Sequence, residues 1–467
     1  MPAQSIVVTR EAAATELSTA LAAIRTQLEL PEAFPAEVEA EATRAIAGYR
    51  LPDDDRTDIP LVTIDPAGSM DLDQALAIEP NGDGWRFFYA IADVPGFVAT
   101  GGAIDAEARL RGQTLYAADG RIPLHPVSIS EGAASLLPDQ VRGSYLWQID
   151  LDSAGRPTST TVTRARVRSR RRWSYDDAHL AVDHEPMFGM LRDLGQARLT
   201  LEAERGGASL STPEILVEPD GNGYRLERRV SLPIESWNAQ LSLLTGMEAA
   251  RMMLDGGIGI LRTMPPAEPE AVDRFRRQTV ARGTPWPVGE SYGDYLRRLS
   301  GDDPQHLAIR YAAASLFRGA TYRAFDGAPP EQTIQSAIAA PYAHVTAPLR
   351  RLVDRFALEV CVALSANVPV PDEVRAALPE IPTAMARSTN LSGRLDRMTL
   401  DAVEAAVLAP HLGETFDAVA ITGSTLQLLD PAVQTAAPSP QQPGTAVRVR
   451  IEATDIAKGT VQVSLVR

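Results

Sequence analysis

The stretch LVTIDPAGSMDLDQALAIE, residues 61–79, carries the residues that decide the fold and the chemistry of this chain. Its first four residues are apolar or β-branched, which predicts a short buried strand that runs directly into Asp65. Asp71 and Asp73 follow after a turn that contains Pro66 and Gly68. A strand end and the loop after it are therefore expected to bring three carboxylates together.

Three carboxylates at this spacing form an oxygen-rich ligand set of the kind that Mg²⁺ or Mn²⁺ prefers. A divalent cation beside a phosphodiester can activate water and neutralise charge on the leaving oxygen. A solvated acidic turn is the alternative, and the spacing alone does not decide between the two. A calcium loop of the EF-hand type fits poorly. Counted from Asp71, its fifth and sixth positions are Ala75 and Leu76, where a ligand and a glycine are needed.

Length and composition limit the class of protein. The chain has 467 residues, 45% hydrophobic and 22% charged, which is typical of globular proteins and suggests about three domains. The net charge of −15 argues against a general nucleic-acid coat, but it is compatible with a nuclease built around acidic residues. No apolar run approaches the ~20 residues of a membrane span. Because Cys361 is the one cysteine and the N-terminus lacks a secretory pattern, we expect a cytoplasmic protein.

Patterns along the chain predict three regions. Residues 10–49 read as two helices, strand patterns dominate between residues 61 and 168, and helical spacing dominates from residue 234 to 408. After Pro410, short alternating stretches predict a small barrel of the OB type. The expected fold is multi-domain α/β. It comprises a small helical domain and linker (1–58), for which a helix-turn-helix is one option, a mixed α/β domain (59–410) and a C-terminal OB-type β-barrel (411–467).

Several further motifs occur in a fixed order around the acidic stretch. After TIDPAGSMDLDQA come YAIADV, RGQTLYAADGRIPLHP, SEGAASLLP, WQIDLD, RRRWSYDDAH and YAHVTAPLRRLVDR. In this order the motifs resemble the catalytic RNB domain of the ribonuclease II and ribonuclease R family, over roughly residues 61–408 and on into the tail. The resemblance is to a variant without the N-terminal cold-shock domains, because the 60 residues before Leu61 are too few for two such barrels. It implies a more open entrance for RNA.

The resemblance implies a 3′→5′ exoribonuclease that hydrolyses single-stranded RNA to nucleoside 5′-monophosphates with two divalent metals, Mg²⁺ or a substituting Mn²⁺. Carried over to this chain, Asp65 and Asp71 would hold metal, and Asp73 would be the metal ligand nearest the reacting water. The family's fourth acidic position is Gln74 here, whose amide oxygen is expected to ligate metal with one negative charge fewer. Weaker metal binding is the expected consequence. A helical glutamate of the family aligns loosely with Asp396, one methylene shorter.

RNA-binding residues are also implied by the resemblance. Tyr116 stands where the family stacks an aromatic ring on the terminal base, and Tyr175 matches a second aromatic that lines the nucleotide pocket. Arg350 of TAPLRR is expected to grip a phosphate and stabilise charge in the transition state, with Arg351 beside it on a helix. The alternatives are a half-buried strand tyrosine and surface helical arginines. His344 is expected to pack or position rather than to bind metal.

The arginine run from Arg164 to Arg172 is the densest positive stretch of the sequence. A phosphate-tracking wall of an RNA channel and a solvated strand face explain it equally well. Trp173 directly after it is expected to lie in the core.

Two functions remain after this comparison of patterns. The first is the metal-dependent exoribonuclease. The second is a catalytically weakened RNA-binding relative, an alternative that rests on Gln74. A phosphohydrolase of small nucleotides is disfavoured by the predicted barrel and by Tyr116. The absence of a G-x-x-x-x-G-K-[ST] loop argues against ATP as a partner, and a monomer is the default expectation.

Overall fold

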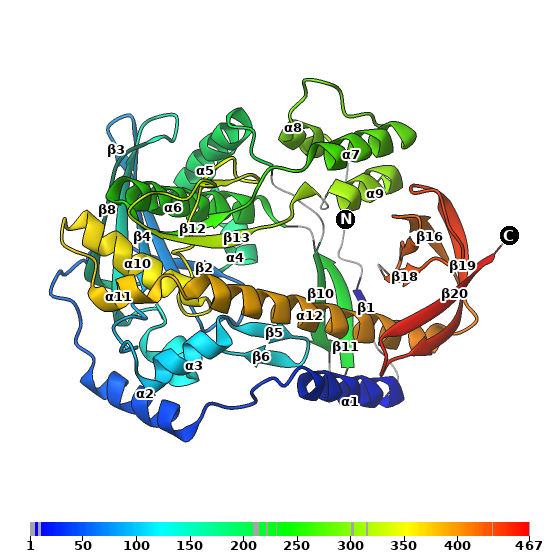
Figure 1. Cartoon of the computed structure of the whole chain (residues 1–467), viewed down its shortest axis with the longest axis horizontal. Coiled ribbons are helices and arrows are strands. Elements are labelled where there is room, and N and C mark those ends of the chain that lie inside the picture. Colours follow the sequence, from blue (N-terminus) through cyan, green and yellow to red (C-terminus); the bar gives the residue numbers. More distant parts are fainter. Residues whose placement is uncertain are drawn as a thin grey trace.

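The computed structural model describes residues 5–7, 11–208, 214–220, 223–229, 231–299, 303–313, 316–431 and 433–466. At its centre is an antiparallel sheet with the strand order β3-β4-β7-β8. These strands are β3 (Gln74–Asn81), β4 (Gly84–Ala92), β7 (Val141–Leu151) and β8 (Pro157–Arg168). The predicted strands of this region are confirmed, and Figure 1 shows the sheet within the larger lobe of the molecule.

Strand β4 is apolar on both faces, which explains its unbroken run of apolar residues. Phe87, Tyr89 and Ile91 pack into one hydrophobic cluster, whereas Phe88 and Ala90 pack into another on the opposite face. A strand that is buried on both sides needs no polar alternation. The sheet is therefore a two-sided support for the helices around it.

Helices cover both faces of this sheet. The first cluster includes residues of α5 (Pro186–Glu204), α6 (Pro233–Gly256) and α10 (Leu352–Ser365). The second takes residues from α2 (Ala36–Gly48), from α3 (Ala103–Arg111) and from the short helix Ser128–Ala133. The mixed α/β domain expected from the sequence is thus confirmed as a layered α/β lobe.

A two-stranded parallel pair places the acidic stretch. Strand β2 (Thr63–Asp65) pairs with β9 (Arg172–Ser174), so Asp65 lies beside Ser174 in register. Ser174 then caps α4 (Tyr175–Leu180), because its hydroxyl accepts from Asp177 N at 3.0 Å. The end of β2 and the start of α4 are therefore held side by side.

A smaller helical unit with its own aromatic core follows the strand β12 (Ile258–Thr263), which pairs with β13 (Thr321–Asp326). The unit consists of α7 (Pro269–Ala281), α8 (Tyr292–Arg297) and α9 (Pro304–Ala313). Its cluster includes Phe275, Trp286 and Tyr295. The short strands β14 (Ile334–Gln335) and β15 (Ala340–Pro341) then lead the chain back to α10, beside which lies α11 (Asp372–Ala377).

The long helix α12 (Ile381–Leu408) joins the larger α/β lobe around the central sheet to the C-terminal sheet, as Figure 1 shows. After a single turn of 3-10 helix (Ala409–His411), five strands form that sheet in the order β18-β17-β16-β19-β20. They are β16 (Thr415–Ala420), β17 (Thr425–Leu428), β18 (Gln434–Ala436), β19 (Ala446–Asp455) and β20 (Thr460–Val466). This order of five strands confirms the predicted OB-type fold. Within the described ranges, no helix has the length and hydropathy to cross a bilayer.

The N-terminal helices do not form the separate domain that the sequence suggested. Leu17 and Leu21 of helix α1 (Glu11–Gln27) belong to the same hydrophobic cluster as residues of α12 and the C-terminal sheet. Val38 and Ala42 of α2 belong instead to the cluster on one face of the central sheet. Because their apolar residues belong to two different cores, the two helices do not form a helix-turn-helix unit. Their alanine-rich periodicity predicted the helices but could not indicate their separate packing partners.

A three-stranded sheet was also missed. Strand β1 (Ser5–Val7) pairs with β11 (Gly223–Arg229), which pairs with β10 (Glu214–Asp220). Its first and last strands are more than 200 residues apart in the sequence, so no local pattern could reveal the pairing. The sheet lies along α1 and α12.

A buried carboxyl at the junction of α12 and the C-terminal sheet predicts a pH effect on stability. Glu404 Oε1 accepts a hydrogen bond from Gln434 N at 3.0 Å, and burial raises the pKa of this carboxyl from 4.5 to about 8. A raised pKa in the folded state favours folding while the group is protonated. This stabilisation is complete below about pH 4.5 and is lost as the pH rises through about 8.

We expect Glu404→Gln to raise the free energy of unfolding at pH 8.5 by about 1–3 kcal/mol, and the melting temperature with it. At pH 5 the substitution should change both quantities little. Glutamine keeps the acceptor for Gln434 N but cannot ionise. Thermal unfolding from pH 5 to 9 measures the effect, with the exposed Glu16→Gln on α1 as the matched control. Equal shifts of the two variants across this range would contradict the assignment.

Candidate active site

The three predicted carboxylates lie in one electrostatic group. Asp65 stands at the end of β2, and Asp71 and Asp73 follow in the loop before β3. Both Asp65 and Asp73 have pKa values raised chiefly by burial and also by the charge on Asp71, while Arg350 lowers both. The charge of Asp71 therefore acts on both of the other carboxyls, and the convergence expected from the spacing stays a prediction.

The surroundings of Asp65 leave one of its carboxylate oxygens without a hydrogen bond. Its Oδ2 is buried and, in the described structure, accepts no hydrogen bond. Burial raises the pKa of this carboxyl from 3.8 to about 7. A buried carboxylate oxygen without a hydrogen-bond partner is costly, even with the charges of Arg350 and Arg172 acting on it, and either a proton or a cation would relieve that cost.

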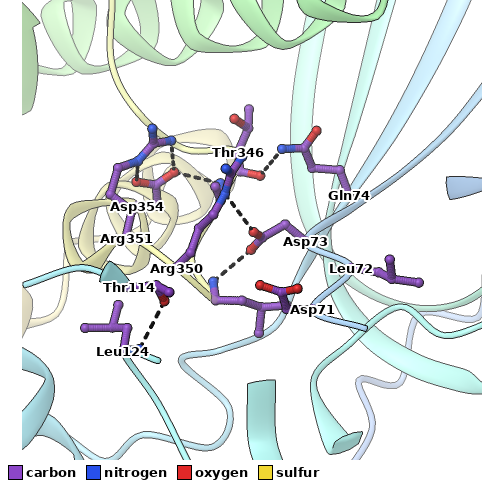
Figure 2. Close-up of polar contacts among 12 residues, drawn as sticks. Asp71, Leu72, Asp73, Gln74, Thr114, Leu124, Thr346, Arg350, Arg351 and Asp354 are labelled. Carbon is purple, nitrogen blue, oxygen red and sulfur yellow. Dashed lines mark hydrogen bonds and ion pairs between the residues drawn. The ribbon is translucent and has the colours of Figure 1, made fainter. Parts of the chain in front are cut away.

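Asp73 is the most deeply buried of the three, with 4% of its surface exposed. Its Oδ1 accepts from the backbone N–H of Leu349 at 2.8 Å, and its Oδ2 lies 3.4 Å from Arg350 Nε. Even with these partners, burial raises its pKa to about 8. Figure 2 shows both contacts, which join the acidic loop to the loop before α10.

Asp71 is held by an arginine that the sequence did not single out. Arg121 Nη1 lies 2.7 Å from Asp71 Oδ1, and its Nη2 lies 2.5 Å from Glu131 Oε1. Arg121 belongs to β6 (Gly120–Ile122), while Glu131 lies in the short helix after it. One guanidinium thus bridges two carboxylates at the edge of the acidic group.

Gln74 does not join this group through its amide oxygen. Its Nε2 donates to the carbonyl oxygen of Thr346 at 2.7 Å, and its Oε1 accepts from the hydroxyl of Tyr89. Figure 2 shows the Gln74 side chain directed to Thr346, apart from Asp71. The amide oxygen of Gln74 thus already accepts one hydrogen bond and keeps only its second lone pair for a cation, and metal ligation by Gln74 stays a prediction. An aspartate could not donate to Thr346, which gives glutamine a reason to stand here.

The loop before α10 carries two arginines with different partners. Arg351 places Nε and Nη2 on the two oxygens of the buried Asp354, at 2.6 and 2.7 Å. Arg350 contacts Asp73, and about half of its side chain is exposed. Arg351 has extended backbone angles and caps α10, so the helical position expected for it was wrong. Arg351 therefore stabilises the start of α10 through Asp354, whereas Arg350 faces the acidic group.

Tyr116 lies on the short hairpin of β5 (Leu115–Ala117) and β6, directly opposite Arg121. Its side chain is among the exposed large ones, with 48% exposure, and the charges of Arg350, Asp71 and Asp73 act on its hydroxyl. The hairpin is fastened to α1, since Arg25 donates to both oxygens of Asp119 at 3.0 and 2.7 Å. An exposed aromatic side chain on an anchored hairpin therefore has its hydroxyl within the electrostatic field of Asp71 and Asp73.

Tyr175 reaches the same group from the start of α4. The charges of Asp65 and Arg350 act on its hydroxyl, which accepts from Asn238 Nδ2 of α6 at 3.4 Å. The Oδ1 of Asn238 is buried and has no hydrogen-bond partner in the described structure. The sequence identified Tyr175 but missed Asn238, which lies within an ordinary helical pattern.

Other predicted residues lie elsewhere. In the arginine run, Arg164 pairs with the buried Asp93 at 2.5 Å and Arg166 pairs with Asp55 at 2.9 Å. The guanidiniums of these two arginines are therefore already paired with carboxylates and are not free to bind RNA phosphates. Asp396 is exposed on α12, with Ser392 Oγ at 3.5 Å as its partner. His344 is partly buried and bonded through Nδ1 to Tyr322 at 2.7 Å, in agreement with a packing or positioning role.

Trp173 lies in the core with 7% exposure, as predicted.

The donor set agrees with a hard cation that is only partly coordinated by protein. Among the described residues, no three His, Cys, Asp or Glu side chains form a ready metal cage. Mg²⁺ commonly needs only one or two carboxylates, because waters and substrate phosphates complete its coordination. The unpaired Oδ2 of Asp65 and the raised pKa values of Asp65 and Asp73 point to missing positive charge. The residues present therefore offer a cation one unpaired carboxylate oxygen, and the rest of its coordination would have to come from water and substrate.

Two family models match the chain. Residues 54–363 match the RNB domain, and residues 414–466 match the RNase II-type exonuclease C-terminal S1 domain. Ribonuclease R of Escherichia coli (strain K12) is 28% identical over 360 residues, which are 71% of this chain and 43% of that protein. This chain therefore spans less than half the length of that curated relative.

Solved structures share the fold. Mycoplasma genitalium RNase R in complex with ribose methylated single-stranded RNA has a TM-score of 0.86 at 18% identity, over 97% of this chain and 78% of that chain. Yeast Ssd1, a pseudonuclease, has a TM-score of 0.69 at 16% identity, over 95% of this chain and 56% of that chain. Since the RNB model alone covers more than half of its residues, this chain belongs to the RNB family and is homologous to ribonucleases R and II.

Proposed function

We propose that this protein is a metal-dependent exoribonuclease that degrades single-stranded RNA from the 3′ end and releases nucleoside 5′-monophosphates. The observation that carries the proposal is the group of Asp65, Asp71 and Asp73, whose charges act together with Arg350 on one another and, for Asp71 and Asp73, on the exposed Tyr116. Membership of the RNB family and the RNA bound to Mycoplasma genitalium RNase R support RNA as the substrate.

In this proposal, Asp65, Asp71 and Asp73 hold Mg²⁺, or Mn²⁺ in its place. The ion would supply positive charge beside the scissile phosphate and make a water more acidic. Asp73 is aimed by the Leu349 N–H, so its charge is fixed in one direction before substrate arrives. Preorganised charge of this kind needs no rearrangement during the reaction.

Tyr116 and Arg350 would hold the terminal nucleotide. An exposed tyrosine ring can stack on any base, which suits an enzyme that does not select sequence. The half-exposed guanidinium of Arg350 can reach a phosphate oxygen while its Nε stays near Asp73. In this proposal Tyr116 would hold the base and Arg350 the phosphate.

A second function has one observation in its favour. Gln74 stands where the family has a fourth carboxylate, and the pseudonuclease Ssd1 shares the fold. The alternative is an RNA-binding protein that has lost catalysis. A nuclease assay distinguishes the two, because RNA binding without cleavage supports only the second.

Asp73→Asn tests the assignment of the centre. Asparagine can still accept from Leu349 N but lacks the charge, so we expect folding to persist and the cleavage rate to fall by at least about 100-fold. The assay is a gel time course on 5′-labelled single-stranded RNA with Mg²⁺, Mn²⁺ or EDTA. Metal-dependent accumulation of a very short labelled product in wild type alone supports the proposal. Intact RNA with wild type in every metal, together with a mobility shift, supports the alternative.

Tyr116 provides a test of base stacking. We expect Tyr116→Ala to raise the KM for single-stranded RNA about 10-fold or more, because stacking contributes ~1–3 kcal/mol per base. Tyr116→Phe keeps the ring and should stay within about 3-fold of wild type. Steady-state kinetics on an oligonucleotide of fixed length measures both variants. A loss of the same size in Tyr116→Phe would show that the hydroxyl, rather than the ring, matters.

The neighbouring arginines offer a matched pair. Arg351→Met leaves the buried Asp354 without its counter-charge, so we expect a loss of about 3–5 kcal/mol in unfolding free energy. Arg350→Met removes a half-exposed group and should change stability by less than about 1 kcal/mol while it lowers kcat/KM. Urea unfolding and kinetics on the two variants give the comparison. Equal destabilisation by both would refute the separate roles.

A further inference from the structure

We propose that the N-terminal helix α1 supports the substrate site from outside, and that its Arg25 is a positioning residue for Tyr116. Arg25 acts through the turn of the hairpin that carries Tyr116, without touching RNA itself. The inference rests on the proposed function, in which the ring of Tyr116 stacks on a base, and it adds a part of the chain that none of the sequence motifs contains.

The hairpin of β5 and β6 has two faces with different surroundings. Leu115 and Ile122 lie opposite each other in register, and both are buried in the hydrophobic cluster that also contains residues of α1 and α12. Tyr116 and Arg121 form the next pair in register, so the alternation of a strand directs their side chains to the other face. The packing of the buried face therefore determines where the ring of Tyr116 lies.

Arg25 holds the turn of this hairpin. Its Nε and Nη2 donate to the two carboxylate oxygens of Asp119, at 3.0 and 2.7 Å. The side chains of Arg25 and Asp119 are 19% and 25% exposed, so most of each is covered. In Figure 1 the turn of the hairpin points toward α1. Because two parallel hydrogen bonds fix direction as well as distance, this contact restrains the turn in one orientation.

A second contact holds the base of the hairpin to the segment that follows α1. Arg111 is 8% exposed and donates to the carbonyl of Pro123 at 3.0 Å and to that of Ala33 at 3.1 Å. Its guanidinium also lies over the ring of Phe34, 3.8 Å from the centroid. The N-terminal segment therefore contacts the hairpin region at its turn and at its base.

The hairpin depends on these contacts for its order, because a two-stranded hairpin by itself is marginally stable at best. Loss of the Arg25 contact should loosen the turn and, with it, the ring of Tyr116. Arg121 keeps its ion pairs with Asp71 and Glu131, so the acidic group should keep its arrangement. We therefore expect RNA binding to weaken while the chemical step changes little.

Binding of a fluorescent single-stranded RNA oligonucleotide in EDTA tests the role of Arg25. Arg25→Met keeps the aliphatic stem and loses the contact with Asp119, so we expect the Kd to rise about 3- to 10-fold, a part of the stacking contribution. The matched control is Arg192→Met on α5, which removes an arginine paired with Asp183 and Asp193 and should leave the Kd within about 2-fold of wild type. Equal Kd values for wild type and Arg25→Met would overturn the inference.

Two further variants separate positioning from a direct contact of Arg25 with RNA. Asp119→Asn removes one of the two acceptors and leaves Arg25 in place, so we expect the Kd to rise about 3-fold or more. If Arg25 itself bound a phosphate, loss of the competing carboxylate would tighten binding, and that result would contradict the inference. In a Tyr116→Ala background, Arg25→Met should add less than about 2-fold, because the ring that it positions is gone. Losses that multiply in this double variant would also contradict it.

Hydrogen–deuterium exchange gives a readout that needs neither RNA nor activity. In Arg25→Met and in Asp119→Asn, the backbone amides of residues 115–122 should exchange faster than in wild type, while those of the central strand β4 keep their rates. Unchanged exchange of the hairpin in both variants would show that Arg25 does not order it. Faster exchange in β4 as well would replace the specific role by a general loss of stability.

Kinetics distinguishes a failure of this inference from a failure of the proposed function. With Mg²⁺, Arg25→Met should raise KM about 3- to 10-fold and leave kcat within about 2-fold of wild type. A fall in kcat at unchanged KM would overturn the positioning role while the nuclease function stands. If wild type binds RNA without cleaving it, the nuclease proposal fails, and the Kd and exchange values still decide the role of Arg25. Wild type that neither binds nor cleaves RNA would overturn both.

Discussion

Two adjacent side chains at the start of β3 hold a loop that follows them by more than 270 residues. The carboxylate of Asp73 accepts the N–H of Leu349, and the amide of Gln74 donates to the carbonyl of Thr346. These contacts are buried or partly buried, so breaking either leaves a polar group without a partner. They bring Arg350 to the acidic group and so join the two halves of the proposed site.

The remaining parts of the site are attached to this junction from outside. Asp65 is placed by the parallel pairing of β2 with β9, and Tyr175 follows from the same pairing through α4. The hairpin of Tyr116 is tied to the acidic loop by Arg121 and to α1 by Arg25. An N-terminal helix thereby supports a residue that we expect to contact substrate, although its own sequence carries no sign of such a role.

Charge explains why arginines are so closely interleaved with the aspartates. Asp65 and Asp73 are buried enough to raise both pKa values strongly, and Arg350 opposes this rise. In the absence of metal, Arg121 and Arg350 provide part of the missing positive charge.

The sequence by itself determined the family, the order of the regions and most of the site. Asp65, Asp71 and Asp73 could be predicted from a strand end and the turn after it, whereas Tyr116 and Arg350 were implied only by the resemblance to the family. Only the tertiary structure decided the partners of these residues. A hydrogen bond such as that from Gln74 to Thr346 depends on backbone groups, which every residue carries and no sequence pattern marks. For the same reason the sequence could suggest Gln74 as a ligand and Arg164 as part of an RNA wall, while the fold gives both other partners.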